Sequence, residues 1–258
     1  MRRDWLVLVD DPASGAWNMA LDAALLSAAE RSGACTLRLY AWDPPTLSFG
    51  RNEPALQRYD RAAIAARGLA VVRRPTGGRA VWHHREVTYA LAAPAAAFGS
   101  LRTSYREIHA MLADALRSLG AAVALAADRP ADGVGAGACF ASAAGGEVMA
   151  LGGGKIVGSA QVRGDGAFLQ HGSVLLAADQ EVVAGVTVGA TTAPSATGLE
   201  ELIGSTRARW KTVSDAIHRA ATARWGVPPN AGVLPPDVRR AADDLVSGYA
   251  DAAWTWRR

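Results

Sequence analysis

Hydrophobic residues recur along the chain in two rhythms, at every second position in some segments and at every third or fourth in others. The first rhythm is typical of a half-buried strand and the second of an amphipathic helix. Helical patterns cover 17–31, 59–67, 101–119, 213–225 and 236–249. Strand patterns cover 5–9, 36–42, 45–50, 69–73, 87–93, 148–151, 155–162 and 167–176. This mixed order predicts an α/β (α+β) fold in which helices pack on a sheet.

Segment 127–147 fits neither pattern, because it is rich in glycine and alanine and has no regular apolar repeat. A stretch of this length without secondary structure inside a compact domain is usually functional or disordered. It contains Cys139, one of the two cysteines, and it ends shortly before Lys155. We therefore treat it as a candidate part of a functional site.

The composition is that of a globular protein, because 50% of the 258 residues are apolar, enough for one large core. The chain shows no internal repeat and no clear linker, so residues 1–258 are predicted to form a single catalytic domain with no C-terminal accessory domain. No apolar run approaches the length of a membrane-spanning helix, and the N-terminus lacks the apolar stretch of a signal peptide. These features predict a cytoplasmic protein with no membrane partner.

The net charge of +3 comes from a small excess of basic residues spread along the chain, which does not indicate a nucleic-acid partner. The basic residues are biased in type: the chain has 27 lysines and arginines, and only Lys155 and Lys211 are lysine. Lys155 also follows three glycines at 152–154. A compact ammonium that points inward at one oxygen would explain this choice, and an ordinary surface lysine is the alternative.

Common catalytic and metal-binding motifs are absent from the sequence. Cys35 and Cys139 stand more than a hundred residues apart, which gives no disulfide framework and no paired metal ligands. Segment 152–155 lacks the serine or threonine of a phosphate-binding loop, and 133–137 lacks the spacing of a dinucleotide-binding fingerprint. There is no His-Glu-x-x-His, no serine nucleophile elbow and no Cys-x-x-Cys. An ordinary metalloenzyme, serine hydrolase or dehydrogenase is therefore not indicated.

Several longer motifs in a fixed order carry a more specific signal. They are NMALD at 18–22, LRLYAW at 37–42, TLSFGR at 46–51, VVRRPTGGRAVWHHREVTYALAAP at 71–94, GKIVGSAQVR at 154–163 and QHGS at 170–173. With these motifs the chain resembles, from about residue 5 to 176, the lipoyl and octanoyl protein transferase family, whose catalytic fold is shared with biotin protein ligases. The resemblance implies a mixed, largely antiparallel sheet flanked by helices.

The resemblance also implies an acyl-binding pocket built from these motifs. Its substrate-binding residues are expected to be Trp42, Arg74, Thr76, Gly77, Gly78, His83, Gly158, Ser159, Ala160 and His171. The adjacent glycines would let backbone approach a ligand closely, with a tight turn between strands as the alternative. The two histidines would hydrogen-bond near the acyl carbonyl, with a core histidine as the alternative. Residues interpreted as structural are Asn18, Asp22, His84, His109 and His218.

Two residues are catalytic under this resemblance. Lys155 binds the acyl carbonyl and stabilises the developing oxyanion, and Cys139 is the nucleophile that attacks a thioester. A cysteine upstream of the lysine motif is the arrangement of one subgroup of octanoyltransferases. The other subgroup has its cysteine downstream, where this chain has Ser173. A small buried cysteine is the alternative reading for Cys139 and the preferred one for Cys35.

We therefore expect an octanoyl-[acyl carrier protein]:protein N-octanoyltransferase of lipoate biosynthesis that needs no metal and no cofactor. It would move octanoate from octanoyl-acyl carrier protein to a lysine of the lipoyl domains of 2-oxoacid dehydrogenases and of the glycine cleavage H protein. The alternatives are a lipoate-protein ligase catalytic subunit that uses ATP and magnesium, a non-catalytic lipoyl-domain binder, and an amidotransferase between lipoyl domains. We expect a monomer whose pocket is rimmed by arginines that attract acidic partners, among them Arg51, Arg79 and Arg163.

Overall fold

The computed structural model describes residues 4–127, 140, 145–189 and 195–257. The strands are β1 (Trp5–Val9), β2 (Cys35–Tyr40), β3 (Thr46–Phe49), β4 (Ala70–Arg73), β5 (Val81–His83), β6 (Glu86–Pro94), β7 (Val123–Leu125), β8 (Val148–Ala150), β9 (Val157–Arg163) and β10 (Ala167–Leu175). The helices are α1 (Gly15–Ser32), α2 (Ala55–Arg58), α3 (Arg61–Ala66), α4 (Ala95–Phe98), α5 (Leu101–Ser118), α6 (Glu181–Ala184), α7 (Leu199–Ile203), α8 (Trp210–Trp225), α9 (Pro236–Ala250) and α10 (Ala252–Thr255).

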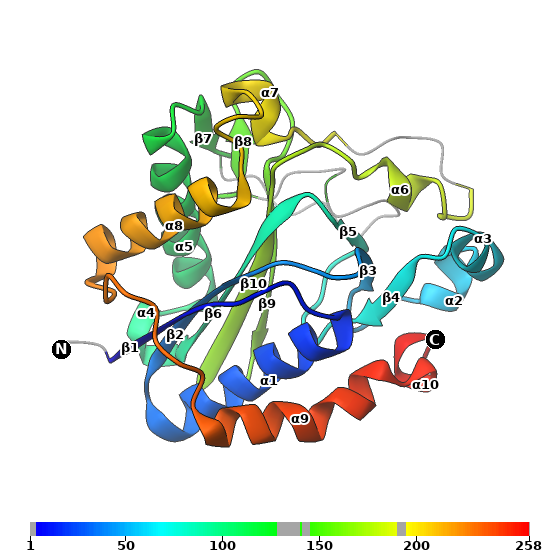
Figure 1. Cartoon of the computed structure of the whole chain (residues 1–258), viewed down its shortest axis with the longest axis horizontal. Helices are drawn as coiled ribbons and strands as arrows, with labels where there is room; N and C mark the ends of the chain where they lie inside the picture. The colour runs from blue at the N-terminus through cyan, green and yellow to red at the C-terminus, as the bar shows by residue number, and fades with distance from the viewer. Residues whose placement is uncertain (1–3, 128–139, 141–144, 190–194, 258) are drawn as a thin grey trace.

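The centre of the molecule is a five-stranded sheet in the order β1-β2-β6-β10-β9 (Figure 1). Strand β1 pairs with β2 in parallel, and the other neighbours in this sheet pair antiparallel. A three-stranded sheet has the order β4-β3-β5, and β7 pairs with β8. The predicted mixed, largely antiparallel sheet flanked by helices is confirmed.

Helices cover both faces of the five-stranded sheet, with α1 and α9 on one face and α5 and α8 on the other (Figure 1). Alternate residues of β2 divide between the two faces. Leu37 and Leu39 join the core on the side of α5 and α8, whereas Tyr40 joins the core on the side of α1 and α9. Because both faces are covered, β2 and β6 are buried along almost their whole length.

The predicted helix 59–67 is wrong in its bounds, because the helix here, α3, covers only Arg61–Ala66 and a separate short helix, α2, precedes the predicted range. Helix α2 ends at Arg58, and Tyr59 then forms an isolated β-bridge with Thr187. Helix α3 begins after Asp60, whose carboxylate accepts the N–H groups of Ala62 and Ala63. An aspartate at this position is a strong helix start, so the local sequence supports the break.

The segments on either side of the predicted insert 127–147 differ from the prediction in two ways. The predicted strand 155–162 begins only at Val157, and Lys155 lies before it, in isolated bridges to Met149 and Ala196. The short strand β7 was not predicted, and its pairing with β8 places the two ends of the insert next to each other. Most of the insert, including Cys139, lies outside the described residues.

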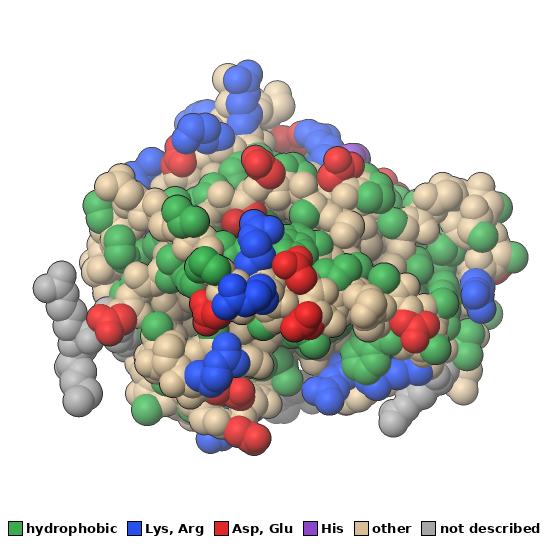
Figure 2. All heavy atoms as spheres, turned by 60° about the horizontal axis from the view of Figure 1, so that its bottom comes forward, with side chains coloured by type: hydrophobic (Ala, Val, Ile, Leu, Met, Phe, Trp, Pro, Cys, Tyr) green, Lys and Arg blue, Asp and Glu red, His purple; other side chains and the backbone are tan. Residues whose placement is uncertain are grey.

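The face that carries α9 is turned toward the viewer in Figure 2. Lys and Arg side chains are interspersed there with Asp and Glu side chains, so neither sign of charge dominates this face. None of the helices in the described part of the chain is long and apolar enough to cross a bilayer.

Candidate active site

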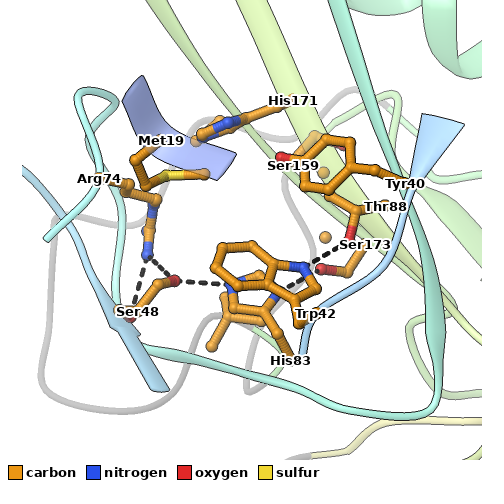
Figure 3. A pocket seen from close by; sticks show the side chains of 14 residues that line it. Met19, Tyr40, Trp42, Ser48, Arg74, His83, Thr88, Ser159, His171 and Ser173 are labelled. Atoms are coloured by element: carbon orange, nitrogen blue, oxygen red, sulfur yellow. Dashed lines mark hydrogen bonds between the residues drawn. The ribbon is translucent and has the colours of Figure 1, made fainter. Parts of the chain in front are cut away.

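A pocket lies where the three-stranded sheet meets α1 and the five-stranded sheet (Figure 3). About 340 Å³ of space lies within it, open solvent at its mouth included. The lining residues are Met19, Tyr40, Trp42, Ser48, Arg74, Val81, His83, Thr88, Gly158, Ser159, Ala160, His171, Gly172 and Ser173. The wall thus combines apolar side chains with a few polar groups that could fix a ligand's orientation.

The strand repeat explains why side chains far apart in the sequence meet here. His171 and Ser173 are two residues apart on β10, so both point to the same face of the sheet. Their partners on β9 are Ala160 and Gly158 respectively, which therefore lie on the same face. The small residues on β9 leave room opposite the two polar side chains of β10.

His83 lies on the pocket wall between a hydroxyl and a carboxylate. Its Nε2 is 2.7 Å from Ser48 Oγ, and its Nδ1 is 2.9 Å from Glu86 Oε1. The indole of Trp42 stacks on the imidazole, with ring centroids 4.0 Å apart and planes at 15°. The ring of His83 is therefore held on one face and at both nitrogens (Figure 3).

Glu86 receives further hydrogen bonds from the same side of the pocket. Trp42 Nε1 donates to Thr88 Oγ1 at 2.7 Å, and the Thr88 hydroxyl in turn donates to Glu86 Oε1. Ser173 Oγ donates to this oxygen at 2.8 Å. The other carboxylate oxygen, Oε2, is buried and has no hydrogen-bond partner among the described residues. Glu86 is thus a buried acceptor that orients His83.

His171 occupies a similar position on the opposite side of the pocket. Its Nε2 is 2.6 Å from Thr76 Oγ1, and its Nδ1 is 2.8 Å from Asp22 Oδ2. Burial lowers the pKa of His171 below its ordinary value, although the hydrogen bond and negative charge of Asp22 act in the opposite direction. The imidazole is therefore neutral at pH 7, with a proton on Nδ1 that it donates to Asp22.

Asp22, on α1, is held by more than the histidine. Its Oδ1 accepts from Arg38 NH1 at 2.8 Å, and its Oδ2 accepts from the Tyr40 hydroxyl at 2.8 Å. Burial by itself would raise the pKa of this carboxyl, but the His171 hydrogen bond and the Arg38 charge outweigh it, so the pKa lies below its ordinary value. Asn18 Oδ1 accepts from Arg38 NH2 at 2.8 Å. Asn18 and Asp22 are thus buried in hydrogen bonds, in agreement with their interpretation as structural residues.

Arg74 spans the wall between the glycine motif and Ser48. Its NH1 donates to Ser48 Oγ at 3.0 Å, and its NH2 donates to the Gly77 carbonyl at 2.8 Å. Gly78 has a φ of 91°, and a Cβ there would lie 2.8 Å from Arg74 NH2. A Cβ on Gly50 would lie 1.9 Å from the Gly78 carbonyl oxygen. Glycine at 50 and 78 is thus required by the fold around Arg74.

The predicted pocket residues therefore divide into two groups. Those that line the pocket are Trp42, Arg74, His83, Gly158, Ser159, Ala160 and His171. Thr76, Gly77 and Gly78 lie behind this wall, where Thr76 holds His171 and the glycines surround Arg74. A Cβ on Gly77 would meet no atom within 4 Å, so the close approach of a ligand to these glycines stays a prediction.

Lys155 is buried, as a lysine that points inward should be. Its exposed fraction is 3%, and its Nζ donates to Glu147 Oε1 at 2.8 Å. Glu147 is also buried and accepts the Tyr105 hydroxyl at 2.9 Å. Lys155 does not belong to the pocket wall described above. The surface alternative is therefore wrong, and the ammonium lies beside the pocket in a buried ion pair.

Phe140 connects Lys155 to the pocket. Its ring centroid is 5.4 Å from Lys155 Nζ, and its ring would be 2.7 Å from a Cβ on Gly158. Phe140 packs with Val81 and Leu175 in a small buried cluster. Cys139 precedes Phe140 in the sequence but lies outside the described residues, whereas Cys35 is buried in the main core, as predicted.

His109, predicted to be structural, is buried on α5 next to the pocket. Its Nε2 is 2.9 Å from Ser159 Oγ, which is 2.7 Å from the Tyr89 hydroxyl. Burial, with the Lys155 charge acting in the same direction, lowers the pKa of His109 to about 3. The side chain is therefore neutral at pH 7 and serves to hold Ser159.

Some site residues were not predicted from the sequence. They are Ser48, Glu86, Thr88 and Glu147, all of which are buried next to a predicted residue. Ser48 lies within the TLSFGR motif, and Glu86 follows His83 by three residues, so motif membership and spacing gave a weak signal. Within the described residues, no group of three or more His, Cys, Asp and Glu side chains is placed to hold a metal ion.

Comparison with known sequences gives a consistent result over nearly the whole chain. The model of the lipoyl protein ligase A/B catalytic domain matches residues 14–223. The octanoyltransferase LipM of Kyrpidia tusciae is 37% identical over 275 residues, which cover 98% of this chain and 99% of the relative. The octanoyltransferase LipM of Moorella thermoacetica is 37% identical over 266 residues, which cover 97% and 96%.

Solved structures show the same fold at lower sequence identity. A lipoate-protein ligase A bound with ATP has a TM-score of 0.82 and 19% identity, covering 99% of each chain. A bi-partite lipoate protein ligase from Thermoplasma acidophilum, studied with its E2 lipoyl domain, has a TM-score of 0.75 and 20% identity, covering 99% of this chain and 97% of that one. The fold implied by the sequence resemblance is confirmed.

Proposed function

We propose that the pocket holds an octanoyl group during transfer between two proteins, since the chain belongs to the lipoyl protein ligase A/B catalytic-domain family. The chain is an octanoyltransferase of lipoate biosynthesis, like the relatives that match it over nearly their whole length. The observation that carries the assignment of the pocket is the convergence there of Trp42, His83 and His171 from three separate motifs. Figure 3 shows how these rings surround the pocket.

The first half-reaction that we propose transfers octanoate from a carrier-protein thioester to Cys139. The Cys139 thiolate attacks the thioester carbonyl, the carrier thiol leaves, and the enzyme becomes S-octanoylated. Lys155 would donate a hydrogen bond to the oxygen on which negative charge develops. Two facts support this proposal: Cys139 directly precedes Phe140, and the Phe140 ring lies close to both Lys155 Nζ and Gly158 of the pocket.

In the second half-reaction a lysine amine of a lipoyl domain attacks the acyl-enzyme and receives octanoate as an amide. A thioester is already activated toward an amine, so this route requires neither ATP nor a metal. We propose the lipoyl domains of 2-oxoacid dehydrogenases and the glycine cleavage H protein as acceptors, octanoyl-acyl carrier protein as donor, and a monomeric enzyme. Support comes from a structural neighbour studied with its E2 lipoyl domain.

Intact-mass measurement tests this proposal. The protein incubated with octanoyl-acyl carrier protein, without ATP, should gain one octanoyl group that hydroxylamine removes. Cys139→Ala should abolish the adduct and the transfer, and Cys35→Ala, a change in the main core, should retain both. An adduct or transfer that appears only with ATP, magnesium and free octanoate would identify a ligase. An adduct formed only from an octanoylated lipoyl domain would identify an amidotransferase, and no adduct under any condition a non-catalytic binder.

Substitutions of Lys155 test the proposed oxyanion contact. Removal of a preorganised oxyanion donor lowers turnover by about 10²- to 10³-fold. Lys155→Arg should be nearly as damaging as Lys155→Ala, because the planar guanidinium does not fit the buried place that the ammonium shares with Glu147 and Phe140. Near-parent acylation in Lys155→Ala, measured by stopped reactions and intact mass, would remove Lys155 from the mechanism.

A further inference from the structure

Ser48, His83 and Glu86 form a hydrogen-bonded series at the pocket wall that the proposed half-reactions do not use. Figure 3 shows the Ser48 and His83 end of this series. The series joins a hydroxyl, an imidazole and a carboxylate, which are groups that enzymes combine to move a proton. Ser48 and His83 both line the pocket, whereas Glu86 lies behind His83. The hydroxyl end of the series is therefore the end that a substrate can contact.

The surrounding hydrogen bonds fix the direction in which a proton can move. Glu86 Oε1 accepts from Thr88 and Ser173, so the carboxylate acts as an acceptor toward His83 as well. His83 consequently carries its proton on Nδ1, and its Nε2 presents a lone pair to the Ser48 hydroxyl. A proton that reaches Ser48 from the pocket can pass to Nε2 without any movement of the ring.

Arg74 prepares Ser48 for this role. Its NH1 donates to Ser48 Oγ at 3.0 Å, so this oxygen accepts from Arg74, donates to His83 and keeps one lone pair. A guanidinium that donates to a hydroxyl oxygen makes the hydroxyl a better proton donor. Because Ser48 lines the pocket, the remaining lone pair can accept a hydrogen bond from a substrate ammonium.

We propose that Ser48, His83 and Glu86 are a proton relay that deprotonates the acceptor amine during transfer of the octanoyl group. His83 is the base, Ser48 carries the proton to it, and Glu86 is a positioning residue that stabilises the imidazolium. This inference rests on the proposed function only in that the acceptor is an amine. It does not require Cys139, because an amine must lose protons whichever thioester it attacks.

The protons of the reaction balance in the following way. A lysine ammonium carries three protons and the amide nitrogen only one, so two are released. Ser48 Oγ accepts the first while its own hydroxyl proton moves to His83 Nε2, which frees the nitrogen lone pair for attack on the carbonyl. Collapse of the tetrahedral intermediate expels a thiolate, which takes one proton to become a thiol. The other proton leaves to solvent, and His83 becomes neutral again.

Several nearby groups stabilise or destabilise the protonated ring of His83. Glu86 favours the protonated ring through its hydrogen bond, and Arg74 opposes it from the other end of Ser48. His171 interacts with His83 across the pocket, and burial keeps His171 neutral. Asp179 and Tyr40 interact electrostatically with Glu86. Glu86, which contacts His83 directly, is thus needed to offset the guanidinium.

Single-turnover kinetics test the relay by comparing two acceptors, a lipoyl domain and hydroxylamine. The S-octanoyl enzyme is prepared for the parent, His83→Gln and Ser48→Ala, and is mixed with a lipoyl domain or with hydroxylamine. Hydroxylamine is not protonated at neutral pH, so it needs no base. Both variants should lose about 10²- to 10⁴-fold in transfer to the lipoyl domain at pH 7, as expected for loss of general-base catalysis. Cleavage by hydroxylamine should remain at the parent rate.

The pH profile adds a readout that a purely structural role would not change. In His83→Gln the transfer rate should rise about tenfold per pH unit toward the pKa of a free lysine, about 10.4, because only the unprotonated amine reacts. Glu86→Gln should show the same trend to a smaller extent. His84→Gln is the matched control, since His84 pairs with Asp179 as His83 pairs with Glu86 but lies at the surface. It should behave like the parent.

Equal losses toward the lipoyl domain and hydroxylamine in His83→Gln would overturn the relay, because they would mean a damaged pocket. Parent-like transfer in Ser48→Ala would equally overturn it. If the parent forms no S-octanoyl enzyme, the covalent route through Cys139 fails instead. The same comparison of variants and pH profiles is then made on direct transfer from octanoyl-acyl carrier protein, so the two failures are distinguishable.

Discussion

The pocket has two histidines that each bridge a hydroxyl and a carboxylate, and the two arrangements differ in what surrounds them. In the first, His171 connects Thr76 to Asp22, and in the second, His83 connects Ser48 to Glu86. The distances are similar, so the bond lengths alone do not distinguish a structural histidine from a reactive one. The groups that surround each histidine distinguish the two.

The Asp22 carboxylate is saturated with donors, because both its oxygens accept and one of them pairs with the fully buried Arg38. Thr76, at the other end, does not line the pocket. By contrast, Ser48 lines the pocket, and Glu86 Oε2 has no hydrogen-bond partner within the described residues. The His171 series therefore stabilises the fold, whereas the His83 series can exchange a proton with a substrate.

The largest expected effect is on stability and comes from the carboxylates. Asp22→Asn should lower the free energy of unfolding by about 3–5 kcal/mol, because it removes the fully buried member of the two carboxylates, Asp10 and Asp22, that pair with buried Arg38. Glu86→Gln should cost less, about 1–3 kcal/mol, since it weakens hydrogen bonds without removing a carboxylate that pairs with a buried guanidinium. Urea unfolding of both variants measures the difference. Equal losses would mean that the two carboxylates are equally structural.

Stability should also fall as the solution becomes acidic, because two buried histidines are neutral. The pKa values of His171 and His109 are lowered by burial, that of His109 to about 3. Below about pH 6.5 the unfolded chain therefore binds protons that the folded chain does not, and each histidine costs about 1.4 kcal/mol per pH unit. The effect ends once the pH falls below the folded pKa.

Urea unfolding between pH 7 and pH 5 measures this dependence. His109→Gln should reduce the slope by the share of one histidine. Asp22 acts in the same direction but only at lower pH, because its pKa is lowered from an already acidic value. A stability that does not change between pH 7 and pH 5 would contradict the neutral state of both histidines.

Removal of the Thr76 hydroxyl tests the His171 series with a smaller expected loss of unfolding free energy. Thr76→Val removes one hydrogen bond to His171 and should cost about 1 kcal/mol in unfolding free energy. Its single-turnover transfer to a lipoyl domain should keep the parent pH profile. If Thr76→Val instead shows the pH profile proposed for His83→Gln, the relay runs through His171.

The smallest effect is expected at the surface pair of His84 and Asp179. The His84 side chain is 46% exposed and the pair resembles other surface ion pairs, so His84→Gln should change stability by about 0–1 kcal/mol. The difference should shrink further in high salt, which urea unfolding at two ionic strengths would show. A loss of several kcal/mol would place His84 in the same class as the buried histidines.

The longer strands and helices, and most of the residues at the pocket, could be predicted from local patterns and motifs, whereas the short strands β5 and β7 were not predicted. The helix 101–119 was predicted well because its apolar residues fall on one face, and α5 covers 101–118. The helix predicted at 59–67 begins only at Arg61, because Tyr59 forms a long-range bridge to Thr187 and Asp60 caps the helix. Apolar periodicity indicates which face of an element is buried, but it does not indicate which distant segment pairs with that element.

The sequence by itself determined the fold class, the family, and the candidate histidines, arginine and lysine, because burial patterns and motif spacing are local properties of the chain. Only the tertiary structure decided which partner each histidine has. Strands β3 and β5 pair with Thr46 opposite His83, which places Ser48 on the same face, two residues along. A shift of one residue in this register would turn Ser48 away from the imidazole, and no local pattern specifies that register.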